Sequence, residues 1–438
     1  MLGLSIDSKI AFRNLLEHGR RSLLLAAAIA AVTSLFVLLT SLALGIRQTL
    51  VETATTITSG DLNVGGFYKP TVGQVAPVVS DAAKLREDVA AVLPELEFAV
   101  ERGHGFAKVV GERASLLRGI NGVDIEREVD LKRVLQIESG NIDDLAQPNT
   151  LLIFEGQAKK LKLRVGDVVT LSAQTSRGVT NTLDCRVVAI AREIGLLSSW
   201  NVFVPNETVR ALFQLAPDVT GVVMVHLAAA QRGDLEASAE RLRTGLASKG
   251  YVLMPPDARP FWQKLERLAH EDWTGQRLDV TTWEDELSFL MWTLQTLHGL
   301  SAALIGVLVA ILIAGVMNTL WIAIRERTRE IGTLRAIGMQ RRQIARLFLL
   351  EATMLGAFGA TAGSVLGGLC ALGLNLAQLQ VPVTVQLFLM RDTLRFAIEP
   401  GVLASGVGLL TAVTGFAALF PSVRASRLQP VDAMAHFG

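Results

Sequence analysis

The sequence contains few residues that could form a covalent or catalytic centre. Its two cysteines are far apart, with Cys185 in a polar region and Cys370 in an apolar run, which excludes a disulfide scaffold. No lysine follows a glycine, so a Walker A phosphate loop is absent, as are the GxSxG, HExxH and CxxC motifs. The six histidines do not cluster at ligand spacing. We therefore predict a non-catalytic chain with no catalytic residues, no metal site and no bound cofactor.

Charged residues are also scarce. They make up 19% of the 438 residues, against about 25% in an ordinary soluble protein, and apolar residues make up 50%. The 42 basic and 41 acidic residues nearly cancel, so the composition gives no case for nucleic-acid binding. With a mean hydropathy of +0.40, this composition indicates a membrane protein whose partner is a lipid bilayer.

Four uncharged runs are long enough to cross a bilayer, which takes about 20 residues as a helix. We place the spans at residues 22–46, 298–324, 347–376 and 400–421. The third uncharged run continues to residue 390 and would make a helix of about 58 Å, too long for one span. Because Pro382 stops a helix, we end this span at Leu376 and expect an outer loop over residues 377–399. The uncharged runs themselves, at residues 22–46, 300–324, 352–390 and 400–423, hold no carboxylate and no arginine, so any energy for transport would come from another chain.

Basic residues set the expected orientation. Arg20 and Arg21 precede the first span, and Arg424 and Arg427 follow the fourth. The loop at residues 325–346 carries seven arginines: Arg325, Arg327, Arg329, Arg335, Arg341, Arg342 and Arg346. The positive-inside rule places all three clusters in the cytoplasm. We therefore expect a multi-pass protein of the cell inner (plasma) membrane, with residues 1–21 and 422–438 cytoplasmic and residues 47–297 outside. The first span is too long for a cleaved secretion signal, so we interpret it as a signal anchor.

The outer segment has the pattern of an α/β domain. Strand-like runs occur at residues 150–154, 168–172, 184–190, 202–204 and 222–227, and helical runs at 81–92, 156–161 and 234–249. We expect one subdomain near residues 140–215, inserted between two parts of another. Pro260 is expected to open a further helix, with Phe261, Leu265 and Leu268 on one face.

Four tryptophans lie shortly before the second span. Trp283 and Trp292 are candidates for the membrane interface, whereas Trp262 and Trp273 are expected in the domain core or on a partner surface. The segment NVGGFYKP at residues 63–70 is expected to form a turn, with a mobile apolar loop near a substrate as the alternative.

The most informative stretch is the cytoplasmic loop. Ile331, Leu334 and Ile337 are spaced three apart and predict an apolar stripe on a short helix, and Gly338 suits its C-terminal cap. A short amphipathic helix of this kind either rests on the membrane surface or inserts its stripe into a groove on a cytoplasmic partner. Composition favours neither alternative.

The segment NTLWIAIRERTREIGTLRAIGM at residues 318–339 resembles the hallmark of FtsX-like ABC transporter permeases. This group includes the lipoprotein-releasing LolC/LolE permeases and the MacB efflux pump. The segments AFRNLLEHGRRSLLL at 11–25, LLIFEGQAKKLKLRVGDVV at 151–169 and PSVRASRLQPVDAM at 421–434 resemble other parts of the same permeases. The resemblance covers nearly the whole chain. Because MacB carries its ATPase on the same chain and this sequence has none, the layout is closest to LolC/LolE.

The resemblance implies a fold and a set of partners. The fold is an α-helical membrane protein with four transmembrane helices (1+3) and a large α/β extracytoplasmic domain, a MacB-like periplasmic core. Two permeases, identical or homologous, pair with two ATP-binding subunits, which hold the ATP and Mg. The loop helix is then the coupling helix. The residues implied to contact the ATPase are Glu326, Arg327, Glu330, Ile331, Leu334, Arg335, Gly338 and Met339. Closure of the ATPases would move the second span and its outer stalk at residues 283–297.

Small residues recur along the third span. Gly359, Gly363 and Gly367 repeat every four residues, and so do Gly356, Ala360, Ser364 and Gly368 beside them. Ala26, Ala30 and Ser34 make a similar stripe on the first span. Small residues allow two helix backbones to approach closely in lipid. The stripes predict helix packing, either within one subunit or between two permeases.

Three functions fit the resemblance. The leading interpretation is extraction or export of lipoprotein or lipid from the outer face of the inner membrane, with a periplasmic lipoprotein carrier as acceptor. The second is MacB-type efflux of a drug or peptide with an adaptor protein. The third is FtsX-like regulation of cell-wall hydrolases. The large outer segment weighs against regulation, because FtsX regulators usually have a much smaller outer domain.

Overall fold

The computed structural model describes residues 10–11, 13–15, 19–71, 73–175, 177–193, 195–228, 232–381, 386 and 393–427. The chain forms two compact units. The helical unit comprises residues 1–48, 294–380 and 393–438, and the α/β unit comprises residues 49–293 and 381–392. Much of the predicted helix at residues 1–21, the outer loop and the C-terminal signature lies outside the described residues.

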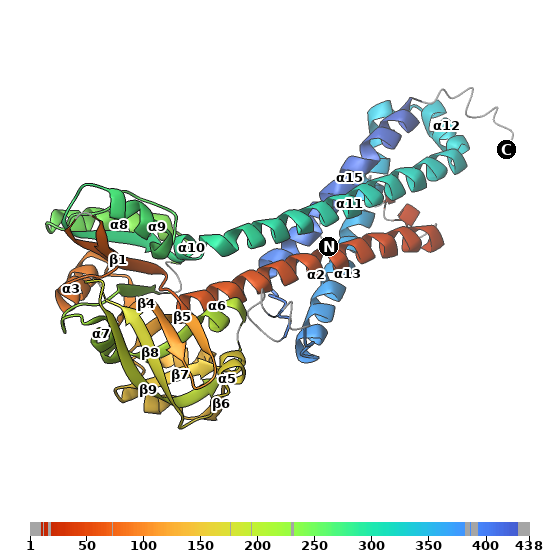
Figure 1. Ribbon diagram of the computed structural model, residues 1–438. Helices are drawn as coiled ribbons and strands as arrows, with labels where there is room; N and C mark the ends of the chain where they lie inside the picture. The colour runs from red at the N-terminus through yellow and green to blue at the C-terminus, as the bar shows by residue number, and fades with distance from the viewer. Residues whose placement is uncertain are drawn as a thin grey trace. The chain divides into compact units, whose positions relative to one another are not determined.

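Within its described residues, the helical unit contains four helices that are long and apolar enough to cross a membrane (Figure 1). They are α2 (Gly19–Ile57), α11 (Ser288–Glu326), α13 (Arg341–Leu376) and α15 (Pro400–Ser426). A shorter helix, α12 (Thr328–Ala336), lies in the loop between α11 and α13. Each of the four helices extends beyond the predicted span in at least one direction, since polar turns continue the helix past its apolar part. Helices α2 and α11 also carry the chain from one unit into the other.

The small-residue stripes of α13 pack within this one subunit. A Cβ atom at Gly359 would lie 2.9 Å from the carbonyl oxygen of Ala26, and one at Gly363 would overlap the backbone of Ala30. Gly367 faces Ser34 in the same way. The second stripe faces α15, where the Ser364 hydroxyl donates to the carbonyl of Leu403 at 3.0 Å. Of the two packing alternatives, the contact within one subunit is therefore the one observed.

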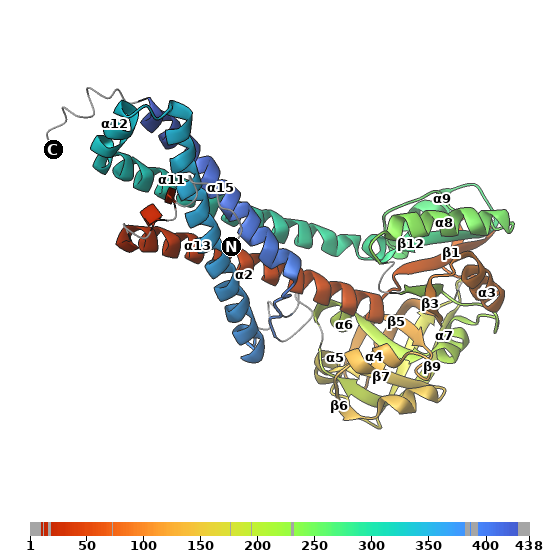
Figure 2. The same cartoon turned by 180° about the vertical axis from the view of Figure 1, so that it is seen from behind.

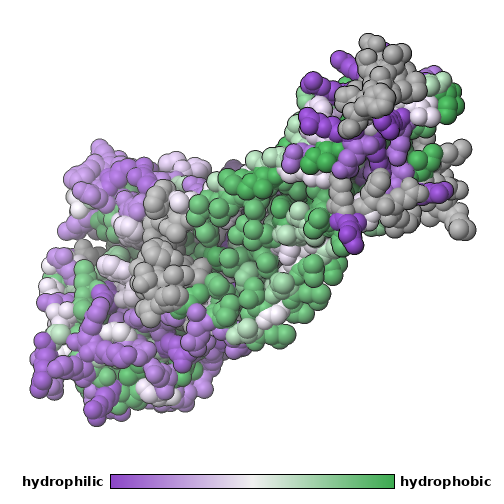
Figure 3. All heavy atoms as spheres, turned by 90° about the vertical axis from the view of Figure 1, so that its right-hand side faces the viewer, coloured by the Kyte–Doolittle hydropathy of each residue, from purple (hydrophilic) through white to green (hydrophobic). Residues whose placement is uncertain are grey.

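Large apolar side chains cover the outside of these helices. Figure 3 shows them as a broad hydrophobic surface, in contrast to the mostly hydrophilic surface of the α/β unit. Exposed members include Leu300, Leu304, Val307, Ile311, Phe358, Leu369, Phe416 and Phe420. An apolar surface of this extent is unusual on a soluble protein and fits contact with lipid.

The α/β unit contains two sheets. The first has the strand order β12 (Gly275–Thr282), β1 (Leu62–Thr71), β11 (Val222–Leu227) and β3 (Leu96–Arg102), with β2 (Gln74–Ala76) paired to β1. All of its pairings are antiparallel. Helices α3 (Ala82–Val92) and α8 (Leu235–Ser248) cover one face, where Leu62, Val64, Leu85 and Leu242 share a buried cluster.

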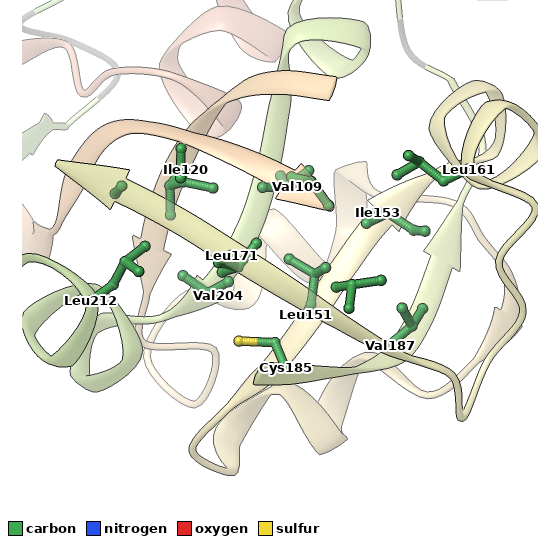
Figure 4. Close-up of a cluster of buried hydrophobic side chains, with 14 of the residues drawn as sticks. Val109, Ile120, Leu151, Ile153, Leu161, Leu171, Cys185, Val187, Val204 and Leu212 are labelled. Carbon is green, nitrogen blue, oxygen red and sulfur yellow. The ribbon is translucent and has the colours of Figure 1, made fainter. Parts of the chain in front are cut away.

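The second sheet has seven strands. Their order is β6 (Ile137–Gly140), β9 (Thr180–Ala191), β7 (Thr150–Phe154), β10 (Asn201–Pro205), β5 (Ser115–Val123), β4 (His104–Val110) and β8 (Val168–Gln174). Because β9 also pairs with β8, six of the strands close into a ring. The interior of the ring is filled by side chains such as Val109, Leu151, Leu171 and Cys185 (Figure 4). Burial raises the pKa of the Cys185 thiol to about 12, so this cysteine is a core residue.

Short helices lie around this ring (Figure 2). They are α4 (Val129–Val134), the 3-10 helix η1 (Ile142–Ala146), α5 (Glu155–Leu161), α6 (Gly195–Trp200) and α7 (Asn206–Phe213). Two further helices follow α8 along the chain, α9 (Phe261–His270) and α10 (Trp283–Glu286).

Three expectations for this unit were wrong. The subdomain is wider than residues 140–215, because β4 and β5 at 104–123 belong to the same ring. The segment at 63–70 forms neither a turn nor a loop but lies within β1, because its glycines pair with β12 as ordinary strand residues. Trp283 is 4% exposed and therefore lies in the protein interior rather than at a membrane interface. Trp273 is a core residue, as expected.

A substitution on α13 tests the packing of the helical unit. The variant Gly363→Ala places a methyl group against the backbone of Ala30 and should destabilise the protein by about 1–3 kcal/mol. In the control variant Gly373→Ala, the added Cβ meets no heavy atom within 4 Å, so stability should be unchanged or slightly higher. Thermal unfolding of the detergent-purified protein measures both. Equal midpoints for the two variants would contradict this packing.

Candidate functional site

The loop helix α12 ends as the sequence predicted. Gly338 has a φ of +104°, a conformation that only glycine adopts without strain. The Met339 amide donates to the carbonyl of Leu334 at 3.0 Å, and the Gly338 amide donates to Arg335 at 3.1 Å. These two bonds form a Schellman cap. The next helix is also capped, because the Gln343 side chain accepts from the Gln340 amide at 2.8 Å.

One side of α12 is buried in the helical unit. Ile331 is 2% exposed and packs with Ile324, Ile344, Phe348 and Ala425, and Met339 lies partly buried against the same cluster. This cluster joins α12 to α11, α13 and α15. Any displacement of α12 therefore acts on the ends of three long helices.

Beside this cluster, an ion pair also connects the start of α12 to α13. Arg327, which is 7% exposed, lies 3.1 Å from the Glu351 carboxylate of α13. It also lies 4.0 Å from Glu330. Removing only one partner of such a buried pair lowers the free energy of unfolding by several kcal/mol. The pair therefore fixes the position of α12 against α13.

The other side of α12 is open. Ile337 is 80% exposed, Glu326, Glu330 and Gly338 are exposed, and Leu334 and Arg335 are half-buried. The predicted single stripe was wrong, because each three-residue step falls about 60° short of a full helical turn. Ile331 therefore faces the core, and Ile337 faces away from it. Ile331 and Arg327 offer almost no surface to an ATPase, and changes there would act through the packing of the loop.

A buried polar cluster lies at the far end of α2 and was not predicted. Arg102 of β3 is 2% exposed, and its guanidinium donates to the carbonyl of Ile57 at 2.6 Å and to that of Thr56 at 2.7 Å. Its Nε donates to Glu128 at 2.9 Å, and Glu128 is 5% exposed. The last carbonyls of a helix lack partners within the helix, and a cation satisfies them well. We call these residues the α2 anchor.

The start of α10 is attached close to this anchor. Four residues beyond the end of α2, the Asp61 carbonyl accepts from the Trp283 amide at 3.2 Å. The Asp61 carboxylate accepts from the Leu227 amide at 2.8 Å and pairs with Arg232 at 3.2 Å. Burial raises the pKa of Asp61 above its ordinary value, although these partners oppose the shift. Asp285 caps α10 by accepting from the Thr282 amide at 2.8 Å.

The end of α2 and the start of α10, the short helix before α11, are thus held at one place in the α/β unit. Apart from the Arg-Gly pair at residues 102–103, no local pattern in the sequence marks Arg102 or Glu128, because a buried arginine cannot be told from an exposed one until its partners are known.

Sequence comparisons assign the family. The model of the MacB-like periplasmic core domain matches residues 22–244, and that of the FtsX-like permease C-terminal matches residues 302–430. The first match alone covers half of the chain. The chain therefore belongs to the family of ABC transporter permeases that join a MacB-like periplasmic core domain to an FtsX-like permease region.

Individual relatives agree with this family. The chain is 38% identical over 120 residues to the uncharacterized ABC transporter permease YvrN of Bacillus subtilis, a match over 27% of this chain and 26% of that one. It is 36% identical to the macrolide export ATP-binding/permease protein MacB of Nitrobacter winogradskyi, over 28% of this chain and 17% of that one. For the pyoverdine export ATP-binding/permease protein PvdT of Pseudomonas syringae pv. tomato, the identity is 40%, over 27% and 16% of the two chains. The chain thus matches about a quarter or less of the length of these relatives.

Two solved structures show a remote likeness. The extracellular domain of the ABC-type transporter YknZ is 16% identical over 43% of this chain and 95% of that one, with a TM-score of 0.29. The periplasmic region of MacB from Actinobacillus actinomycetemcomitans is 15% identical over 45% and 88%, also with a TM-score of 0.29. The family assignment rests on the sequence matches.

The α2 anchor can be tested by removing its cation. The variant Arg102→Met leaves Glu128 buried without a partner and should cost about 3–5 kcal/mol, a fall in the unfolding midpoint of roughly 6–20 °C for a unit of this size. Adding Glu128→Gln should recover part of the loss, because no buried charge then remains unpaired. The control variant Arg86→Met, which breaks the partly exposed pair with Glu101, should change the midpoint little. If Arg102→Met and Arg86→Met behaved alike, the anchor would have no special role.

Proposed function

We propose that this chain is the membrane subunit of an ABC exporter whose ATP-binding subunit is a separate chain. Two copies of the ATPase would act on two permeases, identical or homologous. The α/β unit would lie outside the membrane and respond to ATP binding on the other side. The chain itself would perform no chemistry, and ATP and Mg would be held by the partner.

One observation carries this proposal. Helix α11 runs without interruption from Ser288, next to α10, to Glu326, next to α12. Its first end follows a capped helix that is bonded to Asp61, and its last end is packed against the cluster around Ile331. A force on α12 therefore has a continuous covalent and packed route to the α/β unit. Such a route suits transmission of movement, and it needs no cargo path through the cytoplasm.

The exposed side of α12 is the proposed ATPase contact. It presents the apolar side chains of Ile337 and Leu334 beside the charges of Glu330 and Arg335. An apolar patch rimmed by both signs of charge is typical of a helix that docks in a groove. Ile331 and Arg327 would support this contact from inside rather than touch the ATPase.

The proposed cargo is a lipophilic molecule located at the outer face of the membrane. Lipoprotein or lipid extraction remains the prediction from the layout with separate subunits. The names of the MacB and PvdT relatives, which give macrolide and pyoverdine export, favour efflux of a small molecule as the second candidate. An adaptor protein would then be a partner in place of a lipoprotein carrier.

The ATPase contact can be tested at Ile337. The variant Ile337→Asp should weaken binding and stimulation of the co-expressed ATP-binding subunit by roughly tenfold or more, because it places a charge in an apolar contact. Ile337→Leu should retain both activities. The buried variant Ile331→Val should also retain them, because it keeps an apolar side chain in the cluster. Normal ATPase stimulation by Ile337→Asp would exclude this side of α12 as the contact.

The orientation is tested by labelling. A single cysteine placed at Asp130, whose side chain is 49% exposed, should react with a membrane-impermeant maleimide added outside intact cells or spheroplasts. The test uses a Cys370→Ala background, since Cys370 is exposed and Cys185 is buried. Reaction only after the cytoplasmic face is opened would reverse the topology.

A further inference from the structure

The first sheet of the α/β unit has one face that α3 and α8 leave uncovered. Side chains alternate between the two faces of a strand. Leu62 and Val64 of β1 pack on the helix-covered face. Asn63, Gly65 and Phe67 therefore belong to the opposite face, as do Val222 and Met224 of β11 and Asp279 and Thr281 of β12 by the same alternation.

A cavity of about 540 Å³ lies over this second face, within the α/β unit. Its size is within the range of roughly 300–1,000 Å³ of ligand sites. The apolar part of the wall is formed by Phe67, Phe106, Trp200, Met224, Phe261 and Trp262. Trp200 is 58% exposed and Phe106 is 47% exposed, so both rings present large aromatic surfaces, although the Arg118 guanidinium lies 5.8 Å from the centre of the Trp200 ring.

Most of the charges in the wall are compensated. Arg102 is paired with Glu128, and Asp279 lies 2.6 Å from the ammonium group of Lys264 on α9. Burial lowers the pKa of His104 to about 4, so this residue is neutral at pH 7. Its ring stacks on Phe261 at a centroid distance of 4.0 Å.

Glu286 is the exception. It lines the cavity, and its carboxylate accepts from the Thr281 hydroxyl at 2.8 Å and from the Phe261 amide at 3.4 Å. Among the described residues it makes no ion pair within 4.0 Å. The Lys264 ammonium favours the ionised form of Glu286 but is itself paired with Asp279. A carboxylate held among aromatic rings without an ion pair of its own is a costly arrangement that a positively charged ligand would relieve.

The cavity also contains polar atoms without partners. Asn63 is 3% exposed, and its Oδ1 accepts from the Gly60 amide at 2.8 Å, but its Nδ2 has no acceptor among the described residues. Thr58 Oγ1 and His104 Nε2 are likewise unpaired in the same wall. Buried polar atoms without partners are rare in native proteins, and this wall holds three of them.

We propose that this cavity binds a lipophilic cation, an apolar and aromatic molecule with one positive charge that sits beside Glu286. The aromatic side chains would enclose its apolar body and contribute cation–π contacts to the charge. Among the described residues that line the cavity, Glu286 would supply the one charge that makes no ion pair. Binding of this ligand to the cavity does not depend on the proposed function. Only the further step, that the bound ligand is a transported cargo, rests on the proposed function.

The test measures binding of tetraphenylphosphonium to the purified full chain in nanodiscs, with empty nanodiscs as background. Tetraphenylborate has the same shape and the opposite charge, so it serves as the matched probe. The proposal expects the cation to bind at least tenfold more tightly than the anion. The variant Glu286→Gln should weaken cation binding by at least tenfold. Glu284→Gln removes the same charge from an exposed position on α10 and should leave binding unchanged.

A second variant tests the location without touching Glu286. Gly65 lines the cavity, and a Cβ atom there would meet other atoms no closer than 3.8 Å, so Gly65→Leu can fill the space without a clash at its Cβ. It should abolish cation binding while the unfolding midpoint stays near the wild-type value. Unchanged binding by Gly65→Leu would overturn the location. Loss of binding with Gly65→Leu but not with Glu286→Gln would overturn the proposed charge of the ligand.

The pH dependence gives an independent readout. Burial raises the pKa of Glu286 to about 7, and a bound cation favours the ionised form, so affinity should rise about tenfold from pH 6 to pH 8. The charged groups around it, Lys264 and Asp279, form a buried pair, and His104 stays neutral over this range. Glu286→Gln should show no such rise, and a rise that persisted in this variant would contradict the assignment. The binding measurement contains no ATPase, so a negative result would not affect the proposed contact between α12 and the ATPase. Likewise, a negative result for that contact would not affect the proposed binding site.

Discussion

The α2 anchor binds the last residues of α2 to the first sheet of the α/β unit. A buried guanidinium satisfies the last carbonyls of a helix that runs from Gly19 to Ile57, and a buried glutamate compensates its charge. The desolvation of both groups makes the arrangement intolerant of losing either one. The bond between Asp61 and the start of α10 lies only a few residues away along the chain. The end of α2 and the start of α10 are therefore both fixed to one part of one sheet.

At the other end of the same helices, contacts are close and mostly apolar. Glycines at 359, 363 and 367 allow the backbone of α13 to approach that of α2, and the cluster around Ile331 attaches the loop helix to three long helices. In lipid, such contacts replace the hydrophobic driving force that holds soluble cores together. The tight packing at the loop and the polar anchor in the α/β unit are the contacts that the proposed transmission of movement would use.

Periodicity and charge were enough to predict the membrane helices. A run of 20 or more uncharged residues has few folded solutions other than a span, so α2, α11, α13 and α15 were found. Strands β7 and β11 were predicted with their observed bounds, because they are continuous apolar runs between turn signals. Strand β1 was missed because Gly65, Gly66 and Pro70 resemble a turn, and only pairing with β12 and β11 makes it a strand. The anchor at Arg102 and the unpaired Glu286 depend on contacts between distant residues, which no local pattern reveals.

The central claim is that α12 and the α2 anchor belong to one mechanical route. Hydrogen exchange of the permease assembled with its ATP-binding subunit, with and without ATP, tests it most directly when a hydrolysis-deficient ATPase holds the ATP-bound state. The account predicts that amide protection changes together in α12, at residues 54–61 and at residues 283–288. A change confined to α12, with exchange at the anchor and at α10 unaltered, would contradict it.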